Sequence, residues 1–388
     1  MNFLKNLRTR KCIVGSFAVA EILGLFFYLY IIQKTWEIER KLNLVANIAC
    51  GNDNEAPQDA EAQVAAAEER IFFLEQELQA LKWQVDRGPT PQANASQHPD
   101  DLPGTTAGEA REFEIAPGVK IQMCWIPSGE FTMSSPVDEV GRRDDIESPH
   151  RVAIRSGFWM AKTELTQAQW RAAGGIDTTG RPSQALDGKR VLTWDPRLFD
   201  TDEFRGDLLP VERITWTEAQ QWCEQVTQLQ QANGRIATGW QFALPTEAEW
   251  EYACRAGTET AFNDGNNLTT RPREKCLPLD DMAWYSSNSE EHTHPVGLKK
   301  ANAWGLYDMH GNVMEWCADW YEDWPSNVDT SLLSDPKGPL LGQYRVFRGG
   351  SWDDSQAGCR SASRRRYSPS YFDKNLGLRP ILHLIKNP

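Results

Sequence analysis

The most informative stretch of this sequence is Leu244-Pro-Thr-Glu-Ala-Glu-Trp-Glu-Tyr-Ala-Cys-Arg-Ala-Gly257. Within it, Thr246 is followed three residues later by Glu249, the spacing of a capping box, in which each side chain accepts a hydrogen bond from the other residue's backbone N–H. The pattern predicts a helix that begins at Thr246 and buries Trp250 and Ala253. A short capped helix with a large aromatic side chain in the core is therefore expected here.

Two more helices and several short strands are expected around it. Thr215 begins a second capping box, and the apolar positions that follow predict a helix over Thr215–Leu229. Thr163–Trp170 is the third predicted helix, and strand-like stretches at Val119–Ile126 and Arg151–Trp159 are separated by Gly, Pro and Asp. The 16 tryptophans favour a loop-rich fold held by amphipathic rings that bury area and still find polar partners.

Six other phrases accompany the first along the chain. They are Trp125-Ile-Pro-Ser-Gly-Glu-Phe-Thr-Met133, Lys162-Thr-Glu-Leu-Thr-Gln-Ala-Gln-Trp170, Leu209-Pro-Val-Glu-Arg-Ile-Thr-Trp216, Asn302-Ala-Trp-Gly-Leu-Tyr-Asp-Met-His-Gly-Asn-Val-Met-Glu-Trp316, Arg348-Gly-Gly-Ser-Trp352 and Asn375-Leu-Gly-Leu-Arg379. In this order they resemble the formylglycine-generating enzyme family, the sulfatase-modifying factors. The resemblance implies that residues 111–388 form an α+β domain with a C-type-lectin-like fold and little regular secondary structure. Residues 172–208 match none of the phrases and are expected to be a surface insertion.

The resemblance also indicates which positions would bind copper in an oxidase of this family. Oxidase members of the family bind copper through two cysteines, five residues apart, shortly after the Gly-Gly-Ser. Counting forward from Ser351, these positions hold Asp354 and Cys359. A carboxylate is a hard ligand and a poor match for Cu(I), which prefers soft thiolates. We therefore expect no copper cofactor and no formylglycine formation by the family's mechanism.

The family's disulfides are carried over only in part. If the alignment is anchored on Arg360-Ser-Ala362, Cys359 falls beside a family cysteine that pairs with the one at Cys254, which implies a Cys254–Cys359 disulfide. Cys223 matches another half-cystine, but its partner position holds Pro380. It is therefore expected to be free or joined to one of three others, Cys124, Cys276 or Cys317.

Two further sites are implied by the resemblance. A family calcium site carries over to the side chains of Asp308 and Glu315 and the carbonyls of Gly311 and Val313, hard oxygen donors in a tight glycine turn. A substrate groove would be bordered, beside Asp354, by Ser351, Trp352, Asp353, His310, Arg360 and Arg364. Its arginines are candidates for an acidic peptide or carboxylate; the alternative is that they stack on rings or pair with structural carboxylates.

The first part of the chain predicts a membrane anchor. Residues 13–32 are apolar except for Ser16 and Glu21, and at 1.5 Å per residue they span roughly 30 Å. The basic residues before this run favour a cytoplasmic N-terminus, residues 1–12. No small-residue cleavage site follows, so an uncleaved single-pass helix is expected. Glu21 stays protonated or meets a partner in the membrane, a second copy of the helix or another membrane protein.

A stalk is predicted between the anchor and the domain. After a juxtamembrane segment, residues 33–59, apolar positions alternate at three and four residues from Val64 to Val85, the seam of a coiled coil within residues 60–86. A parallel homodimer through residues 64–85 is the favoured interpretation, and an amphipathic helix packed on its own domain or on a partner is the alternative. Residues 87–110 are predicted to be a flexible linker.

These features favour one function over two others. A net charge of −13 disfavours nucleic acid as a partner. We expect a bacterial inner-membrane protein whose periplasmic domain is a non-catalytic binding, scaffold or regulatory component of a cell-envelope assembly, with a peptide or protein ligand in the groove. The alternatives are a periplasmic oxidoreductase of altered chemistry that does not need the cysteine pair, and a copper-dependent formylglycine-generating enzyme.

Overall fold

The computed structural model describes residues 103–143, 145–175, 178, 206–268, 276–323 and 331–385. The predicted membrane helix with Glu21, its flanks and the coiled coil lie outside the described residues, as does most of the predicted insertion at residues 172–208. Among the described residues, no helix is long and apolar enough to cross a membrane.

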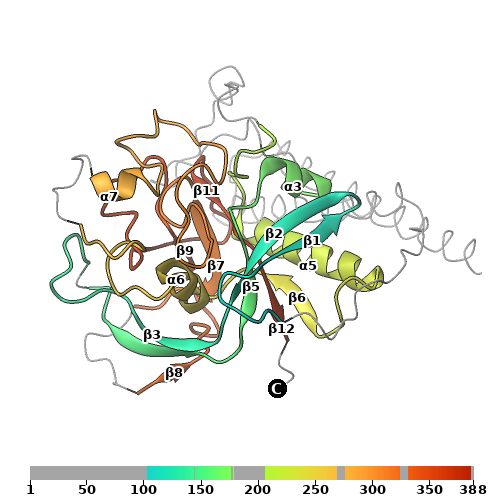
Figure 1. Cartoon of the computed structure of the whole chain (residues 1–388), viewed down its shortest axis with the longest axis horizontal. Helices are drawn as coiled ribbons and strands as arrows, with labels where there is room; N and C mark the ends of the chain where they lie inside the picture. Colours follow the sequence, from blue (N-terminus) through green and yellow to red (C-terminus); the bar gives the residue numbers. More distant parts are fainter. Residues whose placement is uncertain are drawn as a thin grey trace, which may run out of the picture. The chain divides into compact units, whose positions relative to one another are not determined.

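Three small sheets form the framework of the described part of the domain (Figure 1). The largest is antiparallel, with the order β1-β2-β5-β12-β6, so the first and last strands of the domain belong to one sheet. Its strands are β1 (Ala110–Ala116), β2 (Val119–Ile126), β5 (Phe158–Ala161), β12 (Ile381–Leu384) and β6 (Trp240–Ala243).

The second sheet has the order β10-β9-β7-β11, and the third has the order β3-β4-β8. The second sheet comprises β10 (Arg364–Tyr367), β9 (Arg345–Arg348), β7 (Met314–Trp320) and β11 (Leu376–Gly377). The third comprises β3 (Gly129–Met133), β4 (His150–Ile154) and β8 (Leu333–Ser334). The mixture of short strands, few helices and long connections confirms the predicted α+β fold with little regular secondary structure.

The described residues contain the helices α3 (Gln167–Ala172), α5 (Trp216–Ala232), α6 (Glu247–Arg255) and α7 (Leu277–Asp280), of which α3, α5 and α6 pack against strands of the sheets. The predicted capping boxes at Thr215 and Thr246 are both present. The predicted helix over Thr163–Trp170 starts later than expected, because Thr166, not Thr163, is the residue whose side chain caps it. In Figure 1, α5 lies beside β6 and β1, against which it packs.

Two other boundaries differ from the sequence predictions. Arg151–Trp159 is not one strand but two, β4 and β5, in different sheets. The chain bends at Ser156, and at the next residue, Gly157, a Cβ would lie 2.3 Å from the Trp125 ring. The predicted linker also ends before Ala110, because Gly108 N donates to Trp125 O at 2.9 Å and fixes the chain against β2.

Several buried arginines form ion pairs with buried carboxylates from other segments of the chain. Arg348 and Arg255 share Glu251, and Arg379 donates to both oxygens of Glu315. All five side chains are almost fully buried. Since removal of one partner leaves an uncompensated charge in a low-dielectric interior, these pairs hold distant segments in a defined register.

Candidate functional site

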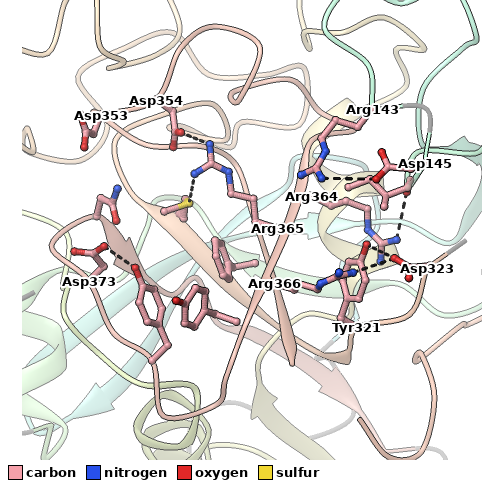
Figure 2. Close-up of a pocket in the computed structure, with 16 residues that line it drawn as sticks. Arg143, Asp145, Tyr321, Asp323, Asp353, Asp354, Arg364, Arg365, Arg366 and Asp373 are labelled. Carbon is pink, nitrogen blue, oxygen red and sulfur yellow. Dashed lines mark hydrogen bonds and ion pairs between the residues drawn. The ribbon is translucent and has the colours of Figure 1, made fainter. Parts of the chain in front are cut away.

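A groove of about 650 Å³ opens beside β10, the edge strand of the second sheet (Figure 2). Its size lies within the range typical of ligand pockets. Strands β7, β9 and β10, the loop around residues 143–146 and the segments that flank β10 supply its lining, which is Arg143, Asp145, Ile146, Met314, Tyr321, Asp323, Phe347, Asp353, Asp354, Arg364, Arg365, Arg366, Tyr367, Tyr371, Asp373 and Asn375.

Arg365 is the basic side chain at the centre of this groove. It extends toward Asp354 in Figure 2 and donates to that carboxylate through Nη2. Its Nη1 lies 3.8 Å from Met314 Sδ. The Arg365 side chain is 42% exposed and the Asp354 side chain 10%, so the pair has one face on the groove and the other in the protein.

Arg366 points to the opposite side of β10. Its Nη1 donates to Asp323 Oδ1 at 2.9 Å, and its guanidinium lies 4.0 Å from the Tyr321 ring centroid. The fully buried Arg364 covers the same ring at 4.5 Å, which leaves Tyr321 in contact with two guanidinium groups. Such contacts are worth about 0.5–1 kcal/mol at exposed sites and more where they are desolvated.

Two tyrosines form the wall on the other side. The rings of Tyr367 and Tyr371 stack with centroids 3.8 Å apart, and the Tyr371 hydroxyl donates to Asp373 Oδ2 at 2.7 Å. Burial, aided by the Asp373 carboxylate, raises the pKa of Tyr371, so its phenol remains protonated at neutral pH. The groove therefore offers half-exposed guanidinium groups and carboxylates beside an aromatic wall.

The residues at the two copper positions do not suit copper. Asp354 Oδ2 accepts from Ser351 Oγ at 2.8 Å, and Oδ1 accepts from Arg365, so both oxygens have partners. Cys359 is fully buried, and burial, together with the Asp354 carboxylate, raises the pKa of its thiol above the ordinary value. One hard, occupied carboxylate and one buried thiol are a poor donor set for Cu(I).

The predicted Cys254–Cys359 disulfide is wrong for this structure, in which both thiols are free. Cys254 Sγ lies 3.7 Å from Ser361 Oγ, two residues further along the chain than Cys359. Cys359 packs instead in a separate buried cluster with Cys276. The other four cysteines within the described residues, Cys124, Cys223, Cys276 and Cys317, are also free and buried.

Two predicted groove residues lie elsewhere. Arg360 is buried and pairs with Glu139 at 2.5 Å and Glu147 at 2.8 Å, so it is structural. His310 is fully buried, with Nδ1 2.7 Å from Cys359 O. The alternative that such arginines pair with structural carboxylates thus applies to Arg360. It applies to Arg364 as well, which donates to Glu247 at 2.8 and 2.6 Å while still lining the groove floor.

Of three further residues predicted to border the groove, Ser351 and Trp352 are buried behind it and Asp353 is on its surface. Ser351 and Trp352 are buried; Ser351 Oγ accepts from Asn375 Nδ2 at 3.1 Å and donates to Asp354. Asp353 is exposed and lines the groove. The sequence interpretation missed the stacked Tyr367 and Tyr371. It also missed Tyr321 and the loop residues Arg143 and Ile146. These residues are far apart in the sequence and approach one another only in the folded chain.

The predicted calcium donors are brought together only in part. Glu315 accepts from Arg379 and, at 2.6 Å, from Trp250 Nε1. Asp308 Oδ2 accepts from Gly297 N at 2.7 Å, whereas its buried Oδ1 has no hydrogen-bond partner among the described residues. No group of three or more His, Cys, Asp or Glu in the described chain is arranged to hold a metal ion. Among the carboxylate oxygens of the predicted set, Asp308 Oδ1 is thus the unpaired one within the described residues, and calcium binding stays a prediction.

The fold and the site together define a class of protein: an α+β domain of short strands, with a groove lined by an arginine-rich edge strand. Residues 110–384 match the model of the sulfatase-modifying factor enzyme 1-like domain, and the chain belongs to this family. It is 29% identical to the formylglycine-generating enzyme of Mus musculus over 315 residues, 72% of this chain and 78% of that one. The Streptomyces coelicolor formylglycine-generating enzyme is also 29% identical, over 75% of this chain and 94% of its own.

Other relatives and structures are similar over the same domain. The serine/threonine-protein kinase Pkn1 of Chlamydia trachomatis serovar L2 is 37% identical over 70% of this chain, which spans 40% of that kinase. Treponema denticola variable protein 1 superposes with a TM-score of 0.53 at 27% identity, over 70% of this chain and 98% of that chain. PvdO from Pseudomonas aeruginosa gives 0.53 at 26%, over 72% and 100%.

Proposed function

We propose that this protein is a membrane-anchored, extracytoplasmic binding component whose sulfatase-modifying factor domain holds a peptide or protein ligand in its groove and does not form formylglycine. The observation that carries the proposal is the Arg365–Asp354 ion pair. It fills the position of the first copper ligand, while the open groove beside it remains large enough for a ligand. The fully buried Cys359 supports the same conclusion, since the second ligand position is closed to the groove.

The location and assembly are part of the proposal. The apolar residues 13–32 would anchor the chain in a bacterial inner membrane with the domain in the periplasm. Residues 64–85 would form a homodimer, and Glu21 would contact a partner within the membrane. A stalk of this kind would present the groove to components of the cell envelope.

One experiment separates binding from catalysis. The full-length chain in detergent is incubated with copper and a sulfatase-type cysteine peptide, next to the Streptomyces coelicolor enzyme as positive control. We expect no loss of the peptide thiol and no aldehyde, and we expect recovery of a defined partner after crosslinking in membranes. Aldehyde formation would overturn the proposal. So would turnover of another substrate that is lost in Asp354→Ala, which would identify an oxidoreductase of altered chemistry.

A further inference from the structure

The four arginines among the groove residues differ in how firmly their carboxylate partners are held. Arg364 is fully buried and donates to both oxygens of the buried Glu247. Arg365 donates to Asp354, whose side chain is 10% exposed and also accepts from Ser351. A ligand that displaced either carboxylate would leave it uncompensated in a low-dielectric setting. Arg364 and Arg365 are therefore fixed parts of the groove.

Arg143 and Arg366 form ion pairs with exposed aspartates instead. Among the described residues, no hydrogen bond is donated by the Arg143 guanidinium, and its ion pair with Asp145 Oδ2 is 3.8 Å long. Arg366 donates to Asp323 Oδ1 at 2.9 Å. The side chains of Asp145 and Asp323 are 71% and 66% exposed. Because exposed ion pairs add little to stability, these two can be exchanged for contacts with a ligand at little cost.

The two exchangeable arginines border the same end of the groove. The Arg366 guanidinium lies 4.0 Å from the Tyr321 ring centroid, and Arg364 covers the same ring at 4.5 Å. Arg364 Nη1 also lies 3.4 Å from the carbonyl oxygen of Ile146, in the loop that carries Arg143. Figure 2 shows Arg143 and Arg366 on the same side of the groove. An anionic group at this end would therefore meet both guanidinium groups.

From these contacts we infer that the groove binds an acidic side chain of its peptide ligand between Arg143 and Arg366, and that Asp145 and Asp323 compete with the ligand for these two arginines. The inference rests on the proposed function and names the ligand chemistry and the competing groups. One guanidinium can donate two parallel N–H bonds to a carboxylate. Neither aspartate makes such a pair, since Asp145 is too distant and Asp323 accepts one bond from Arg366. A ligand carboxylate would therefore gain hydrogen bonds that the aspartates leave unmade.

The first test asks whether the ligand needs an acidic residue. A random hexapeptide phage library is panned on the immobilised full-length chain in detergent, and the tightest-binding hexapeptide is synthesised as the probe. We expect replacement of its acidic residue by the corresponding amide to weaken binding about tenfold. Arg143→Met together with Arg366→Met should reduce that difference to less than about twofold. Arg151→Met is the control, since Arg151 is exposed and pairs with Glu130 outside the groove.

The second test asks whether the aspartates compete. Asp145→Asn and Asp323→Asn should each tighten binding of the acidic hexapeptide about threefold and leave binding of its amide form unchanged. Asp353→Asn is the matched control, because Asp353 is exposed, lines the groove and forms no ion pair among the described residues. It removes the same charge and should alter affinity less than about 1.5-fold at about 0.15 M salt, where distant charges are screened.

The outcomes separate the inference from the proposed function. If the acidic hexapeptide and its amide form bind equally well, recognition of a carboxylate is wrong and peptide binding stands. If Asp353→Asn tightens binding as much as Asp145→Asn and Asp323→Asn do, the effect is one of net charge and the competition is wrong. If no hexapeptide is retained above the detergent-coated support, both the inference and the proposed function fail.

Discussion

Arg365 on β10 donates to Asp354, and Asp354 in turn accepts from Ser351 at 2.8 Å, so the carboxylate is held from two sides. The sequence resemblance puts the first of the two expected copper positions at Asp354, and in this structure both oxygens of that carboxylate are held by neighbouring side chains. Because the pair is half-exposed, its contribution to stability is small, about 1 kcal/mol or less, and its main effect is on what the groove can bind.

Restoring the missing cysteine should not restore copper. In Asp354→Cys the two thiols would again be five residues apart. We expect no tight Cu(I) binding in competition with bicinchoninate, because Cys359 is fully buried, packed close to the backbone at Gly350, and Arg365 would stand beside the new thiol. Stoichiometric Cu(I) binding by Asp354→Cys, with oxidation of a peptide cysteine, would contradict this account of the site.

Removal of the charge on Glu251 should destabilise the domain strongly. Burial alone would raise the pKa of Glu251, but Arg255 and Arg348 outweigh it and lower that pKa below the ordinary value. Glu251→Gln leaves two buried guanidinium groups short of a counter-charge, so we expect a loss of about 3–5 kcal/mol in the free energy of unfolding. Urea denaturation followed by tryptophan fluorescence measures it.

The matched control is Glu130→Gln. Glu130 pairs with Arg151 at 2.7 Å on the surface, and we expect its loss to cost about 0.5 kcal/mol. Equal effects of the two substitutions would show that burial of the Glu251 pairs does not determine their energy.

The stability of the domain should fall between about pH 6.5 and pH 4 in a way that depends on His310. Burial lowers the pKa of His310 from 6.5 to about 4. The unfolded chain takes up the proton near pH 6.5 and the folded chain only near pH 4, so the stability that the neutral ring contributes is complete above pH 6.5 and is lost as pH falls toward 4. His310→Gln should flatten the slope of unfolding free energy against pH in this window. An unchanged slope would mean that His310 is not buried and neutral.

Calcium binding remains a prediction, and a substitution at Asp308 can test it. If the buried, unpaired Oδ1 of Asp308 contacts a calcium ion, the melting temperature of the full-length chain should rise on addition of millimolar Ca²⁺ after treatment with a chelator. Asp308→Asn should remove most of that rise, whereas Asp145→Asn, at an exposed groove residue, should keep it. Identical calcium responses in the wild type and Asp308→Asn would reject Asp308 as a ligand.

The local signals of the sequence were sufficient for the helices that begin with capping boxes. Thr215 and Thr246 cap their helices as expected, because a capping box depends on residues only three positions apart. Arg151–Trp159 shows where local signals fail. Its apolar pattern fits one strand, but the chain bends at Ser156, so that β4 pairs with β3 and β5 pairs with β2 in another sheet.

The candidate site was predicted in its general position and not in its individual residues. Of the two arginines expected to border the groove, Arg364 does and Arg360 does not. Which arginines face the groove depends on where β10 begins and on the distant carboxylates available to each: Glu139 and Glu147 bind Arg360, and Glu247 binds Arg364. Neither the strand boundary nor those long-range partners can be deduced from spacing along the chain.

The buried pairing of Arg360 with Glu139 and Glu147 has an effect beyond its own position. Those two glutamates bracket the loop that carries Arg143 and Ile146 to the rim of the groove, more than 200 residues from Arg360 in sequence. The rim is therefore held by buried contacts that do not line the groove. We expect substitutions of the exposed rim residues Arg143 and Asp145 to cost little in folding, so that binding preference could change there without loss of the fold.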